Sequence, residues 1–326
     1  MNLRKLAHAA LSALLYTSLA AVATPVVAQD KFDKPVKILV GFAAGGTADL
    51  IARVVADKMK DSLGQPVIVE NRPGAIGRIA AEAVKNAAPD GTTIMVMPIG
   101  PMVVVPHVYK DITYDPIKDF TPIARIGSFA SFVAVTPDKP YQSMKALVDF
   151  AKANPGKLSY GVGNSTSQIV GEALKKRTGT DIVRVPYRSN PAVVTDLLGG
   201  QIQIMIADFN TGMTQLKAGK VSALAVLTRN RNPALPDVPT LSETVMPGYH
   251  ILAWAGMFGP AGMPPEAVKV LADAVQKALD NPEVRKRFAG AGTDVYWSGP
   301  QEFTDFVKTE LISWTAMIKE AGIEPE

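Results

Sequence analysis

The sequence has no cysteine and only three histidines among its 326 residues. The lack of cysteine excludes disulfide bonds and thiol chemistry, and histidines as far apart as His107 and His250 do not suggest a zinc site. Neither lies in a motif with a nearby Ser, Asp or Glu, and the Gly-x-Ser-x-Gly elbow of serine hydrolases does not occur. The sequence therefore predicts no metal, no cofactor and no catalytic group. Both histidines are expected to be surface or hydrogen-bonded residues.

The sequence also lacks a strong excess of charge of either sign. It has 34 basic and 30 acidic residues, with a formal net charge of +4. Nucleic-acid binding usually depends on a strong basic stripe, so this near balance argues against a nucleic-acid partner. Without disulfides, stability has to come from burial of a core. The chain is long enough for that, and long enough for two domains.

An uninterrupted apolar run is present only near the start. Arg4 and Lys5 precede this run, and small residues follow it up to Ala28. This pattern predicts a secretory signal, residues 1–28, that is cut after Ala28 and leaves a soluble periplasmic protein. A membrane anchor is the alternative, but Pro25 interrupts the segment beside the cleavage pattern, and no later apolar run reaches about 20 residues.

The remaining chain alternates strand-like and helix-like stretches in two series. Such βαβ order predicts an α/β protein with parallel strands and helices on both faces of each sheet. We assign residues 29–130 and 230–326 to one lobe and residues 131–229 to the other, with the chain crossing between them more than once. Ligands of open α/β sheets bind beyond the carboxyl ends of the strands, so the cleft between the lobes is the expected site. Helices are expected from Thr47, over about 75–88, 143–153 and 165–177, and from near Pro264, Pro282 and Pro300.

The stretch "VKILVGFAAGGTADLIARVV" predicts a buried strand, a glycine turn and a helix. Thr47 or Asp49 can cap the first helical turn, and the junction directs backbone N–H groups and the positive end of the helix dipole at one point. Gly41 and Gly46 have the spacing of a P-loop, but Thr47 stands in place of its lysine; Ala43 excludes the dinucleotide fingerprint. Two interpretations of this stretch remain: a site for an anion that is not a nucleotide, or a tight turn that binds no ligand.

A second stretch, "LSYGVGNSTSQIVGEALKKR", repeats this order of strand, glycine turn and helix. Gly161 and Gly163 allow close approach of the backbone, and Ser165, Thr166 and Ser167 can cap the helix or donate hydroxyls to a ligand. One hydroxyl is enough for a cap, so three in a row favour a ligand only slightly.

Three further side chains lie where predicted strands end. Tyr187 and Trp254 fit either the cleft or the core, and more often the core. Asp208 ends the apolar run "QIQIMIA", where an unpaired buried carboxylate would be costly. We therefore expect Asp208 at the cleft mouth or hydrogen-bonded to a turn.

The order of motifs over the whole mature chain resembles that of the extracytoplasmic substrate-binding receptors of tripartite tricarboxylate transporters, the Bug family. The resemblance rests on "GFAAGGTADLIAR", "VIVENRPGAIGRIAAEAV", "APDGTTIMV", "YDPIKDFTPIARI", "VPYRSNPAVVTDLLGGQ", "KAGKVSALAV", "ALPDVPTLSE" and "WAGMFGPAGMP". It implies a type II-like, two-lobed periplasmic-binding-protein fold, each lobe a mixed, mainly parallel sheet flanked by helices. Such a receptor, expected as a monomer, closes on a small organic carboxylate and delivers it to membrane transporter subunits.

The resemblance also implies which loops hold the carboxylate, largely through backbone groups and water. Together with the two strand-end residues considered above, the candidate ligand-binding residues are Phe42, Ala43, Ala44, Gly45, Gly46, Thr47, Asp49, Gly163, Asn164, Ser165, Thr166, Ser167, Gln168, Tyr187 and Asp208.

The chain departs from the family pattern at several of these positions. Ala43 and Ala44 stand where a proline usually precedes the glycines, Gln168 replaces a usual histidine, and Asn164 replaces a common glycine. Ile76 and Arg78 replace small or uncharged residues; Arg78 is expected to meet a second carboxylate or to be a solvated helix-face charge.

Two other functions stay open at this point. One is an exported enzyme acting on a small anion, with Asp208 or His107 as acid/base group. The other is an exported sensory or orphan binding protein, which needs the same ligand-bound form. The sequence leaves open whether the ligand is an aliphatic, aromatic or multiple acid, or an amino acid.

Overall fold

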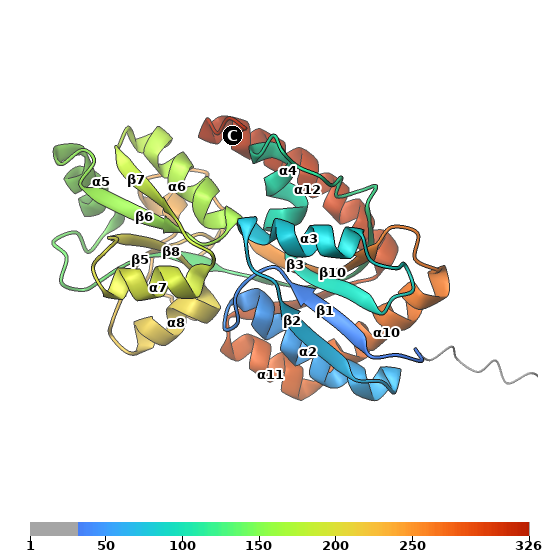
Figure 1. The fold of residues 1–326 in the computed structure, drawn as a ribbon. Coiled ribbons are helices and arrows are strands. Elements are labelled where there is room, and N and C mark those ends of the chain that lie inside the picture. Colours follow the sequence, from blue (N-terminus) through green and yellow to red (C-terminus); the bar gives the residue numbers. More distant parts are fainter. Residues whose placement is uncertain (1–31, 326) are drawn as a thin grey trace, which may run out of the picture. The chain divides into compact units, whose positions relative to one another are not determined.

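The computed structural model describes residues 32–325, which belong to one compact unit. The predicted signal segment, residues 1–28, lies outside the described residues. The described chain forms two mixed β-sheets, each flanked by helices (Figure 1).

The first sheet has the strand order β11-β4-β10-β3-β1-β2. Strands β2, β1, β3 and β4 run in one direction, and β10 and β11 run against them. The strands are β1 (Val36–Val40), β2 (Val67–Asn71), β3 (Thr93–Pro98), β4 (Phe120–Phe129), β10 (Ala253–Pro260) and β11 (Thr293–Ser298). The helical segments that follow or precede these strands are α2 (Thr47–Leu63), η1 (Ala75–Gly77), α3 (Arg78–Lys85), η2 (Gly100–Val104), α4 (Val105–Val108), α10 (Pro265–Asp280), α11 (Pro282–Gly290) and α12 (Pro300–Ala321).

The second sheet has the order β7-β6-β8-β5-β9, with β5 alone running against the other strands. Its strands are β5 (Ser131–Val135), β6 (Leu158–Val162), β7 (Ile182–Pro186), β8 (Ile204–Asp208) and β9 (Ser222–Val226). Its helices are α5 (Met144–Ala153), α6 (Ser165–Thr178), α7 (Asn190–Leu198), α8 (Phe209–Lys217) and α9 (Leu241–Thr244).

The chain passes between the sheets twice. It leaves the first sheet at the end of β4 and enters the second at β5, with only Ala130 between them, and it returns after β9 to form β10. The strand that arrives by each crossing, β5 or β10, runs antiparallel to both of its neighbours in the sheet that it enters. The carboxyl ends of β1 and β6 face the same region, since Phe42 and Gly163, which follow these strands, line one cavity.

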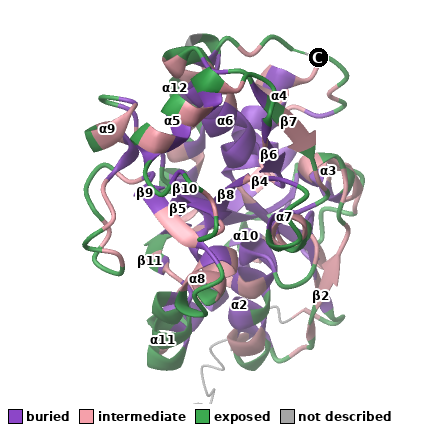
Figure 2. Ribbon diagram, turned by 90° about the vertical axis from the view of Figure 1, so that its left-hand side faces the viewer, coloured by how far each residue is buried: buried purple, intermediate pink, exposed green. Residues whose placement is uncertain are grey.

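Burial follows the position of each strand in its sheet. All residues of β5 and β8 are buried, and so is all of β1 except Lys37, because helices cover both faces. The edge strand β2 has no fully buried residue, and Figure 2 shows it in the intermediate colour. These continuous apolar runs explain why the central strands were recognisable from sequence.

Most predicted helices occur at the expected places. The helices predicted near Pro282 and Pro300 begin at those residues, and α10 begins at Pro265. The single helix predicted over 75–88 is wrong in its first turn: η1 precedes the shorter helix α3, because residues 74–77 all have positive φ angles. Such angles do not continue an α-helix.

Candidate functional site

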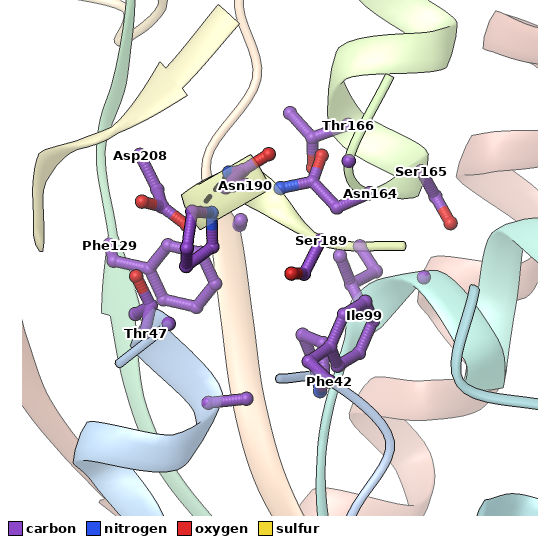
Figure 3. A pocket seen from close by; sticks show the side chains of 17 residues that line it. Phe42, Thr47, Ile99, Phe129, Asn164, Ser165, Thr166, Ser189, Asn190 and Asp208 are labelled. Carbon is purple, nitrogen blue, oxygen red and sulfur yellow. Dashed lines mark hydrogen bonds between the residues drawn. The ribbon is translucent and has the colours of Figure 1, made fainter. Parts of the chain in front are cut away.

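A cavity lies where the carboxyl ends of strands from both sheets face each other (Figure 3). The space between its lining atoms amounts to about 500 Å³, including the part that is open to solvent. Eight of the residues predicted from sequence line it: Phe42, Gly46, Thr47, Gly163, Asn164, Ser165, Thr166 and Asp208.

The first loop is held in shape by Asp49, which does not itself line the cavity. Its carboxylate accepts hydrogen bonds from the Gly45 N–H (3.0 Å), the Arg53 Nε (2.9 Å) and the Asn71 Nδ2 (2.9 Å). Asn71 also donates to the carbonyl of Phe42 (3.0 Å), so both ends of the loop are tied to one cluster. Burial by itself would raise the pKa of Asp49, but these hydrogen bonds outweigh it and lower the pKa.

The predicted cap of α2 is only partly correct. The N-cap residue is Gly46, and no side chain caps it. Asp49 instead satisfies the N–H of Gly45, just before the helix. The hydroxyl of Thr47 is buried and has no hydrogen-bond partner in the described part of the chain. Thr47 therefore remains available to a ligand.

The N-cap of α6, at the end of the second loop, is a residue that the sequence analysis did not single out for capping. Asn164 accepts a hydrogen bond from the Ser167 N–H (2.8 Å), and Ser167 Oγ interacts with the Asn164 backbone in return, which forms a capping box. Both the N–H and the hydroxyl of Ser167 therefore take part in the helix cap. Ser165 and Thr166 are not part of it, although both are buried. The two hydroxyls left over by the cap are the two that line the cavity.

Asp208 satisfies both expectations made for it. It lines the cavity, and it caps α8 by accepting hydrogen bonds from the N–H of Thr211 (3.2 Å) and from its hydroxyl. Its second oxygen accepts from Asn190 Nδ2 (3.1 Å). A buried carboxylate with these donors is not an orphaned charge.

Several helices begin at this cavity. The first residues of α2, α6 and α7 line it, and so does the N-cap residue of α8. The first N–H groups of a helix have no partner within the helix and carry a partial positive charge. No Lys or Arg lines the cavity in the described chain. An anion bound here would therefore be held by backbone N–H groups, hydroxyls and amides.

Three buried polar atoms of the cavity have no hydrogen-bond partner within the described residues. They are Thr47 Oγ1, Ser165 Oγ and Asn190 Oδ1. Leaving such atoms unpaired costs about 1–3 kcal/mol each, so native proteins pair them with protein, water or ligand. Phe42, Ile99 and Phe129 add apolar surface, and the cavity can thus take a small molecule with a polar end and a carbon skeleton.

Other predicted residues lie outside this cavity. Ala43, Ala44 and Gly45 shape the first loop without lining the cavity, and the Gly45 carbonyl accepts a hydrogen bond from Asn210 Nδ2 of α8, a helix beside the second sheet (3.2 Å). Gln168 and Tyr187 line a neighbouring cavity.

Arg78 is not the solvated charge that was one expectation for it. Its guanidinium pairs with the Asp111 carboxylate (2.9 Å), lies 5.3 Å from the centre of the Tyr109 ring, and does not line the cavity. Trp254 belongs to the core, as expected, and its indole N–H donates to Glu310 (2.8 Å).

The histidines also lie outside the cavity. His107 Nε2 is 3.3 Å from the Thr315 hydroxyl, and burial lowers the pKa of His107. His250 Nε2 is 2.9 Å from Arg229. Both are hydrogen-bonded residues, as the sequence predicted.

Sequence reasoning missed the contribution of α7 and of the segment after β3. Ser189 and Asn190 line the cavity at the start of α7, and "RSNP" contains a cap residue followed by proline, a signal of a helix start that was overlooked. Gly100 and Phe129 carry no such signal, because they reach the cavity only through the packing of the sheets.

No helix in the described residues is long and apolar enough to cross a membrane.

Comparison with known proteins identifies the family. Residues 51–323 match the model of the tripartite tricarboxylate transporter family receptor. Protein BugT of Bordetella pertussis is 30% identical over 311 residues, which cover 94% of this chain and 95% of that protein.

Two solved structures from Rhodopseudomonas palustris are similar in fold. Rpa4515 with adipate has a TM-score of 0.86 and 32% identity, covering 90% of this chain and 99% of that chain. MatC with bound malate has a TM-score of 0.84 and 30% identity, covering 88% of this chain and all of that chain (100%). The two sheets flanked by helices are thus those of a periplasmic binding protein, and the chain belongs to the tripartite tricarboxylate transporter receptor family.

Proposed function

We propose that this protein is an extracytoplasmic receptor that binds a small organic carboxylate in the cavity between its two sheets and delivers it to membrane subunits of a tripartite transporter. Residues 29–130 with 230–326, and residues 131–229, are the two lobes that close on the ligand. The protein acts in the periplasm, as a monomer, after loss of residues 1–28.

The observation that carries the proposal is the unpaired polar lining of the cavity. Thr47 Oγ1 in α2, beside the first sheet, and Ser165 Oγ in α6, beside the second sheet, are hydroxyls that are buried without a partner in the described chain. The starts of α2, α6 and α7 add backbone N–H groups with partial positive charge. An ionised carboxylate offers two strong acceptor oxygens to such donors, and it needs no arginine in this setting.

The solved relatives support the same ligand class. Adipate and malate, named in the two similar structures, are both carboxylates. The first loop and the second loop described above are the segments that the family resemblance implies for this role. The eight candidate residues that line the cavity are proposed to surround the ligand.

We propose binding without chemical conversion. The acid/base candidates for an enzyme are poorly placed for catalysis: Asp208 is held by Thr211 and Asn190 as a helix cap, and His107 does not line the cavity. A sensory or orphan receptor would use the same ligand-bound form. Capture of transporter subunits from membranes by the ligand-loaded protein, but not by the stripped protein, supports delivery to a transporter.

The test is thermal unfolding of the mature protein after unfolding and refolding to remove carried-over ligand. The panel contains mono-, di- and tricarboxylates, aromatic acids and amino acids. At about 100 times its dissociation constant, a ligand stabilises the native state by about 2.7 kcal/mol, which raises the midpoint by several degrees. A selective rise with one class of acids is expected. A flat response to the whole panel would contradict the proposed function.

A further inference from the structure

A groove lies where α8, beside the second sheet, meets α2 and α11, beside the first sheet. Figures 1 and 2 both show α8 next to these two helices. The lining atoms enclose about 630 Å³, including the part that is open to solvent. We call it the α8–α11 groove, and the residues that matter below are Leu50, Phe209, Met213, Thr214, Lys217 and Arg287.

The two walls of the groove touch each other at its base. Asn210, which lines the groove, donates a hydrogen bond from its Nδ2 to the Gly45 carbonyl of the first loop (3.2 Å). Gly292, just before β11, lies against Phe209, since a Cβ added to Gly292 would be 2.5 Å from the Phe209 Cβ. Phe209 directly follows Asp208, which lines the ligand cavity. A movement that separates the two sheets would therefore also pull the walls of the groove apart.

The groove carries positive charge from both walls. Lys217 of α8 and Arg287 of α11 line it and are exposed, and no acidic residue of the described chain lines it. Neither of these side chains forms a salt bridge or a hydrogen bond within the described residues. Glu283, one helical turn before Arg287, is instead bound to Lys58 of α2 (2.7 Å). The two cations thus remain available to an acidic partner.

The floor of the groove is apolar. Phe209 is 1% exposed, and Leu50 and Met213 are half-buried. Aromatic residues, Met and Arg are enriched in surfaces that bind other proteins. A membrane surface is flat on this scale, whereas a protein loop can enter a groove and place a carboxylate between Lys217 and Arg287. The groove therefore fits an acidic loop of a protein better than a lipid surface.

We propose that the α8–α11 groove is the docking site for an acidic loop of a membrane subunit of the transporter, and that it is complete only when bound ligand holds the two sheets together. A carboxylate of the loop contacts Lys217 and Arg287 at once. The loop then binds the ligand-loaded arrangement more tightly than one in which the walls are apart, so the subunit distinguishes a loaded receptor from an empty one. This inference rests on the proposed function and names the surface that delivery would use.

The test is uptake of the best-binding carboxylate into phosphatidylcholine vesicles that contain the purified membrane subunits. Uptake is measured against the concentration of ligand-loaded receptor. Lys217→Glu and Arg287→Glu are each expected to raise the half-saturating receptor concentration about tenfold or more, because attraction becomes repulsion. Carboxylate affinity in calorimetry should stay within about twofold, since neither residue lines the ligand cavity. Added salt should weaken the wild-type interaction more than that of the variants.

Arg285→Glu is the matched control for charge. Arg285 is an exposed residue of the same helix, is paired with Asp280 (3.1 Å) and does not line the groove. The same change of charge at this position should leave the half-saturating concentration within about twofold, because a charge outside the contact acts only through screened solvent.

Blocking the groove is a second, independent perturbation. The chain has no cysteine, so Thr214→Cys introduces a single thiol at an exposed position of the groove. The unlabelled variant should support uptake, and attachment of a bulky maleimide should abolish it without loss of carboxylate binding. Lys308→Cys, an exposed position of α12 that does not line the groove, should tolerate the same label.

Normal half-saturation in both charge-reversed variants, or an equal rise in Arg285→Glu, would overturn the docking site, while uptake that depends on the wild-type receptor would leave the proposed function standing. Binding of the loaded receptor to phosphatidylglycerol vesicles without subunits, lost in both variants, would assign the groove to lipid instead. A dimer in sedimentation that both variants dissociate would assign it to a second copy of the chain. If the wild-type receptor does not stimulate uptake at all, delivery to the transporter fails as well.

Discussion

The contact between Gly100 and Ser165 offers a direct way to perturb the approach of the two sheets. Gly100 lies in η2, next to the first sheet, and Ser165 begins α6 of the second. A Cβ added to Gly100 would lie 2.4 Å from Ser165 Oγ and 3.0 Å from Ser165 Cβ, and the third-nearest atom is also in Ser165. Gly100 does not have a positive φ, so Gly100→Ala leaves its local backbone unstrained.

The expected result is weaker ligand binding. Overpacking of a well-packed contact costs about 1–3 kcal/mol, and this cost falls on the arrangement in which the two sheets meet. If ligand binding requires that arrangement, affinity for the best carboxylate falls by about 5- to 150-fold, while the midpoint of thermal unfolding without ligand changes little. Titration calorimetry measures the first quantity and differential scanning calorimetry the second.

Two further variants separate this explanation from others. Ser165→Gly removes the atoms that would clash. In that background, Gly100→Ala is expected to reduce ligand affinity much less, which corresponds to a coupling energy between the two substitutions of about 1 kcal/mol or more. Gly290→Ala is the control, because an added Cβ there meets no atom within 4 Å. Wild-type affinity in Gly100→Ala, or the same loss in both Ser165 backgrounds, would refute the reasoning.

Three other predictions concern the loops. Replacing Ser165 and Thr166 together with Ala should weaken carboxylate binding by about 1–3 kcal/mol in calorimetry with little change in the midpoint, since neither hydroxyl is part of the helix cap; unchanged affinity would remove them from the site. Asp49→Asn should lower the free energy of unfolding by about 1–3 kcal/mol at neutral pH. Because the pKa of Asp49 is lowered in the folded protein, its carboxylate stabilises the fold above the ordinary pKa of aspartate, and this stabilisation is lost as the pH falls through the pKa of the folded state. The difference in unfolding free energy between wild type and Asp49→Asn should therefore shrink below about pH 4. A difference that does not depend on pH would contradict this assignment. Asn210→Ala removes the donor to the Gly45 carbonyl and should raise the ligand dissociation rate severalfold, with about 0.5–1.5 kcal/mol lost, and an unchanged rate in stopped-flow release would argue against a role in closure.

The sequence was informative where a rule of local chemistry operates. The central strands β1 and β8 are continuous apolar runs because helices cover both of their faces, and α11 and α12 begin at proline. The two glycine turns and their helix starts were recognisable for the same reason, and the structure brings eight of the predicted residues to one cavity.

Two strands were missed for physical reasons. β4 contains Pro122 within a mostly buried strand, and proline normally argues against such an assignment. β11 lies at the sheet edge, and its aromatic residues Tyr296 and Trp297 are adjacent and exposed, so it shows no alternation. The left-handed conformation of Ile76 could not be expected either, because β-branched residues disfavour it.

Within the site, the residues that depend on tertiary contacts were the ones that escaped prediction. Gly100 is important only because Ser165 lies against it, and Phe129 lines the cavity only because β4 ends beside β5. The different roles of the four residues in "NSTS" could not be predicted either: Asn164 and Ser167 form the helix cap, whereas Ser165 and Thr166 line the cavity.

A crystal structure of the stripped protein with its best-binding carboxylate tests the central claim most directly. The account predicts a carboxylate whose oxygens lie about 2.7–3.2 Å from backbone N–H groups at the starts of α2 and α6, with Thr47 Oγ1 or Ser165 Oγ among the partners. A carboxylate bound outside this cavity, or a ligand that fills it with its acidic group directed away from both helix starts, would contradict the account.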